Sequence, residues 1–258
     1  MGGNSLMVVL KSDREIQKIK EVGHIVYLAL QAAGEAIKPG ITTEEINKIA
    51  EDLIKTHGAN PSCKGYPAGD SNPFPAGCCI SVNDEVIHGI PGKRKLQEGD
   101  LVSIDIVVDK DGYFADATRS FVVGNNPKAE KLIEVTKHSF FEGLKYAKIG
   151  NRISDISNAI QQYVEKNGYS VVREFQGHGV GIAIHEEPGV PNFGKPGKGP
   201  RLQNGMVLAI EPMVNEGGRE IYELDDGWTI VTEDGSLAAH YENTIAITEK
   251  GPIILTNE

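Results

Sequence analysis

Two aspartates stand in apolar, strand-like sequence, where a charged side chain costs free energy. Asp105 and Asp116 lie in LVSIDIVVDKDGYFADATRSF, two alternating runs around the turn signal Asp111-Gly112. This pattern predicts a β-hairpin. With a two-residue loop, their separation of eleven positions places both carboxylates on one face as cross-strand neighbours, whereas a three-residue loop would place them on opposite faces. Adjacent carboxylates repel each other, and a cation between them removes that cost.

Two further acids stand in apolar runs nearer the C-terminus. Glu211 is the single charge in GMVLAIEPMV, and Glu242 comes just before a β-branched run in HYENTIAIT. A lone aspartate such as Asp105 is often exposed at a sheet edge or paired with an arginine, here Arg119. Separate β-runs that each carry an acid are harder to explain as unrelated ion pairs, because buried charges are normally paired or bound to a metal. The acids therefore predict a metal site.

Imidazole donors come from the segment GHGVGIAIHEEP. It is not the zinc motif HExxH, because Gly189 stands where the second histidine would be. His178 and His185 are seven positions apart and would point to opposite faces of one uninterrupted strand, but the intervening glycines permit a bend. We expect one of them to bind metal and the other to face the ligands or the substrate.

A third histidine ends a strand just before a turn, a place where reactive residues are common. It is His88, in NDEVIHGIP, and an ordinary surface or core histidine is the alternative interpretation. The remaining histidines lack such a context and receive no role: His24, His57, His138 and His240.

The donor set indicates which metals are suitable. Four carboxylates and one imidazole suit divalent Mn, Fe, Co or Zn. Two such ions about 3.5–4 Å apart can share a bridging hydroxide and bind a carbonyl oxygen. A structural zinc ion would prefer cysteine ligands, and Cys63, Cys78 and Cys79 have the wrong spacing. The residues alone therefore predict a metallohydrolase.

Helices and strands must bring these residues together. Capping boxes at Ser12–Glu15 and Thr42–Glu45 predict two helices, the first stopped by Pro39-Gly40 and the second by Gly58. Further periodic segments predict helices at about 127–147 and 152–167, and strand-like runs at 206–214, 228–232 and 240–248.

Two segments of the sequence resemble each other and could be an internal repeat. Residues 38–58, KPGITTEEINKIAEDLIKTHG, align with 148–168, KIGNRISDISNAIQQYVEKNG, at an offset of 110. Chance similarity between two amphipathic helices is the alternative. A true repeat predicts an α+β chain of two α/β halves that share one site. Because no linker separates them, we expect one domain over residues 1–258, with residues 1–11 as a short N-terminal extension.

Composition limits the class of protein. The net charge of −10 argues against a nucleic-acid-binding surface. The odd number of cysteines and the absence of a CxxC pair favour a reducing compartment. No apolar run approaches the roughly 20 residues that a membrane helix needs, and none resembles a signal peptide. We expect a cytoplasmic protein without nucleic-acid or membrane partners.

These residues resemble the type I methionine aminopeptidases. Order, spacing and neighbours match the five metal ligands of that family, in SIDIVVDKDGYFADATRSF, GHGVGIAIHEEP, LAIEPM and AHYENTIAIT: Asp105, Asp116, His178, Glu211 and Glu242. The resemblance runs from about Ser12 to Leu255 and implies the pita-bread fold, with pseudo-twofold-related halves around a central β-sheet. It also implies removal of the initiator methionine from nascent chains, at the ribosome exit, by a monomer with two divalent ions.

The resemblance also implies roles for other residues. His88 would contact the substrate near the scissile bond, and His185 would stabilise the tetrahedral intermediate. Glu211 would be both ligand and proton acceptor, while a metal-bridging hydroxide attacks the first peptide bond. The methionine pocket would be formed by Cys79, Ile184 and Trp228, with Phe74 near the place of a pocket tyrosine. The segment from Tyr66 to Cys78 is longer than the family pattern leads us to expect.

Two other functions compete with this interpretation. An X-Pro aminopeptidase or prolidase shares the fold and the ligand set but usually carries a sizeable extra N-terminal domain. A non-catalytic pita-bread binding protein would have lost ligands, whereas all five, together with His88 and His185, are present here.

Overall fold

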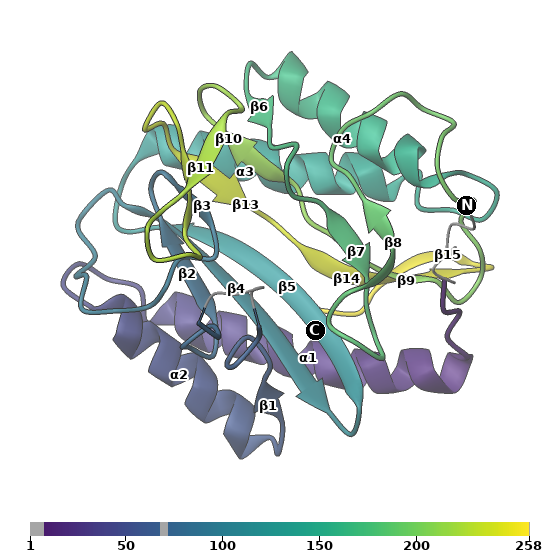
Figure 1. Ribbon diagram of the computed structural model, residues 1–258, viewed down its shortest axis with the longest axis horizontal. Coiled ribbons are helices and arrows are strands. Elements are labelled where there is room, and N and C mark those ends of the chain that lie inside the picture. Colours follow the sequence, from purple (N-terminus) through teal and green to yellow (C-terminus); the bar gives the residue numbers. More distant parts are fainter. Residues whose placement is uncertain (1–7, 68–71, 258) are drawn as a thin grey trace.

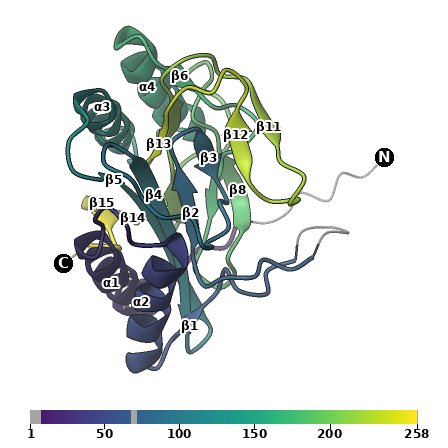
Figure 2. The same cartoon turned by 90° about the vertical axis from the view of Figure 1, so that its left-hand side faces the viewer.

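The computed structural model describes residues 8–67 and 72–257, so most of the predicted N-terminal extension lies outside the described residues. Within them, four α-helices lie on one side of the strands (Figure 2). These helices are α1 (Asp13–Glu35), α2 (Thr43–Thr56), α3 (Pro127–Leu144) and α4 (Ile153–Lys166). Ser12 and Thr42 form the predicted capping boxes. The first helix ends at Glu35, before Pro39-Gly40. None of these helices is both long and apolar enough to cross a membrane.

The predicted hairpin is the longest β structure. β4 (Leu101–Lys110) pairs along its whole length with β5 (Tyr113–Val122) through a two-residue loop. Its residues, Asp111 and Gly112, have positive φ values of 52° and 81°, as a tight hairpin turn requires. Asp105 lies opposite Thr118 and Val107 opposite Asp116, so the two aspartates are diagonal neighbours on one face. The opposite edge of β4 pairs with β1 (Asn60–Pro61) and β2 (Cys79–Val82).

The C-terminal half contains the second large sheet, with the order β15–β14–β9–β7–β8. Its strands are β7 (Gly177–Gly179), β8 (Glu186–Val190), β9 (Val207–Ile210), β14 (Asn243–Thr248) and β15 (Gly251–Ile254). One smaller sheet contains β6 (Ser170–Val171), β10 (Met213–Asn215) and β13 (Ala238–His240). The other contains β3 (Glu85–Ile87), β11 (Ile221–Glu223) and β12 (Ile230–Thr232).

The strand-like runs predicted at 206–214 and 240–248 do contain strands, but each run is broken into parts of two strands. β9 ends before Glu211-Pro212 and β10 begins after it, while β13 and β14 flank Tyr241-Glu242. At the first break the chain passes from the large sheet to a small one, and at the second it returns from that same small sheet to the large one. Pro212 has no N–H to donate to a ladder. Each acid consequently lies where two sheets meet. The run at 228–232 is also shorter, because β12 begins only at Ile230.

The two similar sequence segments, 38–58 and 148–168, form the same structure. α2 and α4 begin and end at the same offset of 110 residues, and the glycines before them, Gly40 and Gly150, have φ values of 90° and 92°. One core cluster packs α1 and α2 against β4, and another packs α3 and α4 against β9 and β14. Figure 1 shows the two helix pairs on opposite edges of the view, with the strands between them. The prediction of two α/β halves is confirmed.

Candidate metal centre

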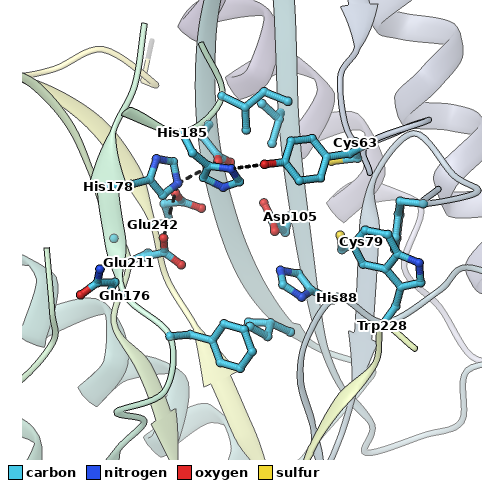
Figure 3. Close-up of a pocket in the computed structure, with 18 residues that line it drawn as sticks. Cys63, Cys79, His88, Asp105, Gln176, His178, His185, Glu211, Trp228 and Glu242 are labelled. Atoms are coloured by element: carbon cyan, nitrogen blue, oxygen red, sulfur yellow. Dashed lines mark hydrogen bonds and ion pairs between the residues drawn. The ribbon is translucent and has the colours of Figure 1, made fainter. Parts of the chain in front are cut away.

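A cavity of about 400 Å³ brings together side chains from both halves of the chain (Figure 3). Every site residue predicted from the sequence lines this cavity: Phe74, Cys79, His88, Asp105, Asp116, His178, Ile184, His185, Glu211, Trp228 and Glu242. The hairpin supplies two of the acids, and the two strand breaks supply the other two.

Hydrogen bonds to the backbone and to side-chain oxygens hold the acids in place. The Thr118 hydroxyl donates to Oε2 of Glu242 at 2.9 Å. The Thr244 hydroxyl accepts from the backbone N–H of Asp116 at 2.9 Å and donates to its carbonyl at 2.8 Å. Asn192 donates to the carbonyl oxygen of Glu211 at 2.9 Å. These bonds hold the backbone at Asp116 and Glu211 and one carboxylate oxygen of Glu242.

His178 presents a lone pair to these acids. Its Nδ1 lies 2.9 Å from the carbonyl oxygen of Gly179, which can only accept, so the ring proton is on Nδ1. Burial, together with the nearby His185, lowers the pKa of His178 to about 4, so the ring is neutral near pH 7. Its Nε2 is 3.8 Å from Oδ2 of Asp116 and 3.6 Å from Oε1 of Glu211. An unprotonated nitrogen faces two carboxylates, an arrangement that a cation would stabilise.

The electrostatics of the acids favour the same conclusion. Burial raises the pKa of Asp116, Glu211 and Glu242 well above the usual range, and the neighbouring carboxylates raise it further. Burial also raises the pKa of Asp105. Oδ1 of both aspartates and Oε1 of Glu242 are buried and have no hydrogen-bond partner among the described residues. Buried oxygens without partners normally belong to a metal site or bind water.

The geometry fits a divalent cation. One ligand atom each from Asp116, His178 and Glu242 lies within 4.8 Å of the other two. Carboxylate oxygens with one imidazole nitrogen form a suitable set for divalent ions of the first transition row. Glu211 and Asp105 line the same cavity beside this group. The residues present can therefore hold a metal.

The other two predicted histidines lie beside the acids. The chain bends after β7, so His185 returns to within 4.4 Å of His178, measured between ring centroids (Figure 3). The expectation that a bend brings them together is confirmed. His88 follows β3 with a φ of 59°, and its ring packs edge-on against Phe175 and Trp228. Burial, then His240 and His185, lower the pKa of His88 to about 4.

An apolar wall completes the cavity. Phe74 is buried and meets Trp228 edge-on, with 5.1 Å between ring centroids. Cys79 lines the cavity, whereas the adjacent Cys78 is fully buried and its sulfur lies 3.3 Å from the Asn47 amide oxygen. Of the two adjacent cysteines, Cys79 is therefore the one that reaches the cavity. A hydrogen bond with Cys63, together with burial, raises the pKa of this thiol.

Sequence reasoning missed several residues around the acids. Additional side chains line the cavity: Cys63, Tyr66, Ile87, Val107, Phe175 and Gln176. His240, which received no role, is buried with its Nε2 3.4 Å from Oε2 of Glu211. Its position two residues before Glu242 in a strand-like run was the only available signal. The other histidines without a predicted role, His24, His57 and His138, are exposed.

Known proteins are similar to this chain over nearly its whole length. A methionine aminopeptidase from Clostridium perfringens is 55% identical over 251 residues, which cover 97% of this chain and 99% of that protein. The crystal structure of methionine aminopeptidase from Thermotoga maritima superposes with a TM-score of 0.94 at 41% identity, covering 98% of this chain and 100% of that one. Prolidase from Pyrococcus furiosus gives a TM-score of 0.76 at 25% identity, and the match covers 97% of this chain but only 66% of that one.

The family model agrees with the site and the fold. Residues 17–249 match the model of metallopeptidase family M24, a span that contains every cavity residue described above. The paired α/β halves around the cavity are those of the pita-bread fold, as the resemblance implied. With its acids, its neutral imidazole and this match over most of its length, the chain belongs to metallopeptidase family M24.

Proposed function

We propose that this chain is a metal-dependent aminopeptidase that removes the initiator methionine from newly made proteins. The observation that carries the proposal is one cavity in which a cluster of buried acids and a neutral imidazole adjoins an apolar wall of sulfur and aromatic groups. The methionine aminopeptidases that align with nearly the whole chain support it.

The metal ligands in this proposal are Asp105, Asp116, His178, Glu211 and Glu242. They would hold two divalent ions, from among Co, Mn, Fe and Zn, and the unpartnered carboxylate oxygens support this assignment. Divalent ions bound there supply Lewis acidity, which polarises a substrate carbonyl and activates water at neutral pH.

Three side chains would handle protons and substrate atoms. Glu211 would accept the proton released when water adds to the carbonyl, since its raised pKa suits a base that must hold a proton. His185 would donate to the oxygen that becomes negative in the tetrahedral intermediate. His88, which lines the same cavity, would contact the substrate near the scissile bond.

The apolar wall would select the methionine side chain. Phe74, Cys79, Ile184 and Trp228 line one region together with Cys63. A thioether is flexible and polarisable and makes favourable contacts with aromatic rings. A branched or charged N-terminal side chain would pack poorly there.

The proposal extends to the cellular setting. The substrates would be nascent chains at the ribosome exit in the cytoplasm, and the enzyme would act as a monomer without nucleic-acid or membrane specificity. Residues 1–258 would form one catalytic domain, because residues from both halves complete the cavity.

Peptide hydrolysis by metal-stripped protein tests the function directly. Mn, Fe, Co and Zn are each added back in the presence of Met-Ala-Ser, Leu-Ala-Ser or Ala-Pro-Ser. We expect metal-restored release of methionine from the first peptide only. Cleavage mainly before proline would indicate an X-Pro aminopeptidase or prolidase. Absence of cleavage with every metal would refute the enzymatic proposal and favour a binding protein.

A further inference from the structure

Lys11 is a buried cation from the segment that precedes α1. Its side chain is 1% exposed, and its ammonium group forms an ion pair with Glu186, whose side chain is 8% exposed. Nζ also donates to the carbonyl oxygen of Val9 at 3.1 Å. Lysine is rarely buried unless it is paired, and removing one partner of a buried pair leaves an uncompensated charge. The ion pair joins parts of the chain that are 175 residues apart.

The Glu186 carboxylate also accepts hydrogen bonds from the backbone. Its Oε1 accepts hydrogen bonds from the backbone N–H groups of Ile182 and Ala183, at 2.6 Å and 3.1 Å. These residues belong to the tip that connects β7 to β8. One oxygen of this carboxylate therefore binds the backbone of the tip, and the other forms the ion pair with Lys11.

The tip carries two cavity residues, Ile184 and His185. It also packs tightly against the N-terminal part of the chain. A Cβ atom on Gly181 would lie 2.7 Å from Cδ1 of Ile19 in α1 and 3.0 Å from Cε of Lys11, and the φ of this glycine is +136°. Its carbonyl accepts from the backbone N–H of Phe114 at 2.8 Å. The conformation of the tip thus depends on Lys11 and its neighbours.

The backbone of Lys11 is itself anchored. Its N–H donates to the carbonyl oxygen of Gly205 at 2.7 Å, and a Cβ on Gly205 would come within 2.5 Å of the Lys11 carbonyl oxygen. Gly205 lies just before β9, the strand that leads to Glu211. Lys11 therefore connects the tip that carries His185 to the chain that carries a candidate metal ligand.

We propose that Lys11 is a positioning residue, which acts through Glu186 to hold the 180–185 tip so that His185 faces the reacting carbonyl. This inference rests on the proposed function and adds a determinant that lies outside the cavity. Lys11 does not line the cavity, so its effect on the reaction is indirect.

The test compares Lys11→Met with the double variant Lys11→Met/Glu186→Gln. In the double variant the glutamine oxygen can still accept from Ile182 and Ala183, and no unpaired buried carboxylate remains. Positioning predicts at least a tenfold fall in kcat on Met-Ala-Ser in both variants, with KM within about twofold of the wild type. The double variant should regain stability in urea unfolding without regaining kcat. Lys11→Arg, which keeps the charge, should retain most of the activity.

Two controls separate positioning from a general loss of stability. Ile160 is fully buried in α4, which packs against α3, and it does not line the cavity; Ile160→Ala should lower stability while kcat stays at the wild-type value. Calorimetric affinity for Mn should be the same in the wild type and both Lys11→Met variants. A wild-type kcat in the double variant, or a fall in metal affinity that matches the fall in kcat, overturns the inference. If the wild type itself releases no methionine with any metal, the proposed function fails first, and that result is distinct from a loss confined to the variants.

Discussion

The phenol oxygen of Tyr66 lies 2.6 Å from Nδ1 of His185, across 119 residues of sequence. The two rings meet edge-on, with 5.3 Å between their centroids. When the phenol donates to Nδ1, the neutral imidazole carries its proton on Nε2. The ring is neutral near pH 7 because burial lowers the pKa of His185. Tyr66 can therefore select the tautomer that donates toward the cavity.

Removing this phenol oxygen should affect the chemistry more than substrate binding. We expect Tyr66→Phe to lower kcat on Met-Ala-Ser by about tenfold with KM within about twofold, because the aromatic ring that lines the cavity remains while the tautomer is no longer fixed. Tyr222→Phe is the matched control, since Tyr222 is 52% exposed, and it should leave both constants unchanged. Equal kcat values for Tyr66→Phe and the wild type would show that Tyr66 does not select the tautomer of His185.

Replacing Glu211 separates its catalytic from its structural contribution. Glu211→Gln should lower kcat by about 10²-fold or more, because the amide cannot accept a proton. The metal-free variant should be more stable than the metal-free wild type at pH 8. Burial and Asp105 raise the pKa of Glu211, and an acid with a raised pKa loses stability as the pH rises through that value. The amide of Glu211→Gln does not ionise, so the variant does not lose stability in this way.

Steady-state kinetics measure the expected fall in kcat, and thermal unfolding in chelator measures the expected gain in metal-free stability. Glu216→Gln is the matched control, because Glu216 forms an ion pair with Lys128 at the surface and should change little. Full activity in Glu211→Gln would exclude it as the proton acceptor. A metal-free variant less stable than the wild type would mean that the buried charge is compensated in the fold.

Local sequence signals predicted the elements that position the site. The capping boxes at Ser12 and Thr42 and the turn at Asp111-Gly112 act through neighbouring residues, so the sequence displays them directly. The hairpin register then placed Asp105 and Asp116 on one face without any tertiary information. The similarity between segments 38–58 and 148–168 indicated two halves of the chain and hence a site shared between them.

The features that were missed depend on contacts between distant segments. The apolar pattern continues through both breaks, so only Pro212 gives a local signal at the first, and nothing local marks the change of sheet at Tyr241-Glu242. His240 matters only because the fold brings it to Glu211. Tyr66 likewise matters through a residue 119 positions away. Such relationships are fixed by packing and have no periodic signature.

Metal removal should lower thermal stability. Bound cations neutralise the repulsion among the buried acids, and a ligand at 100 times its Kd stabilises the native state by about 2.7 kcal/mol. For a chain of this size, that corresponds to a melting temperature higher by roughly 5–10 °C. Calorimetric melting with excess chelator and with Mn or Co checks this, and Asp116→Asn should abolish most of the difference. Identical melting with and without metal would contradict a metal site among these acids.

His88 should make stability depend on pH in a specific window. Its pKa falls from 6.5 to about 4 in the fold, chiefly through burial. Between these values the unfolded chain binds the proton more readily, so the stability from neutral His88 is complete above pH 6.5 and is lost as the pH falls toward 4. Between roughly pH 7.5 and 5, the metal-free wild type should lose about 2 kcal/mol more stability than His88→Asn, whose asparagine tolerates the φ of +59°. Urea unfolding in chelator at both pH values measures the difference, and parallel losses in the two proteins would show that His88 titrates normally in the fold.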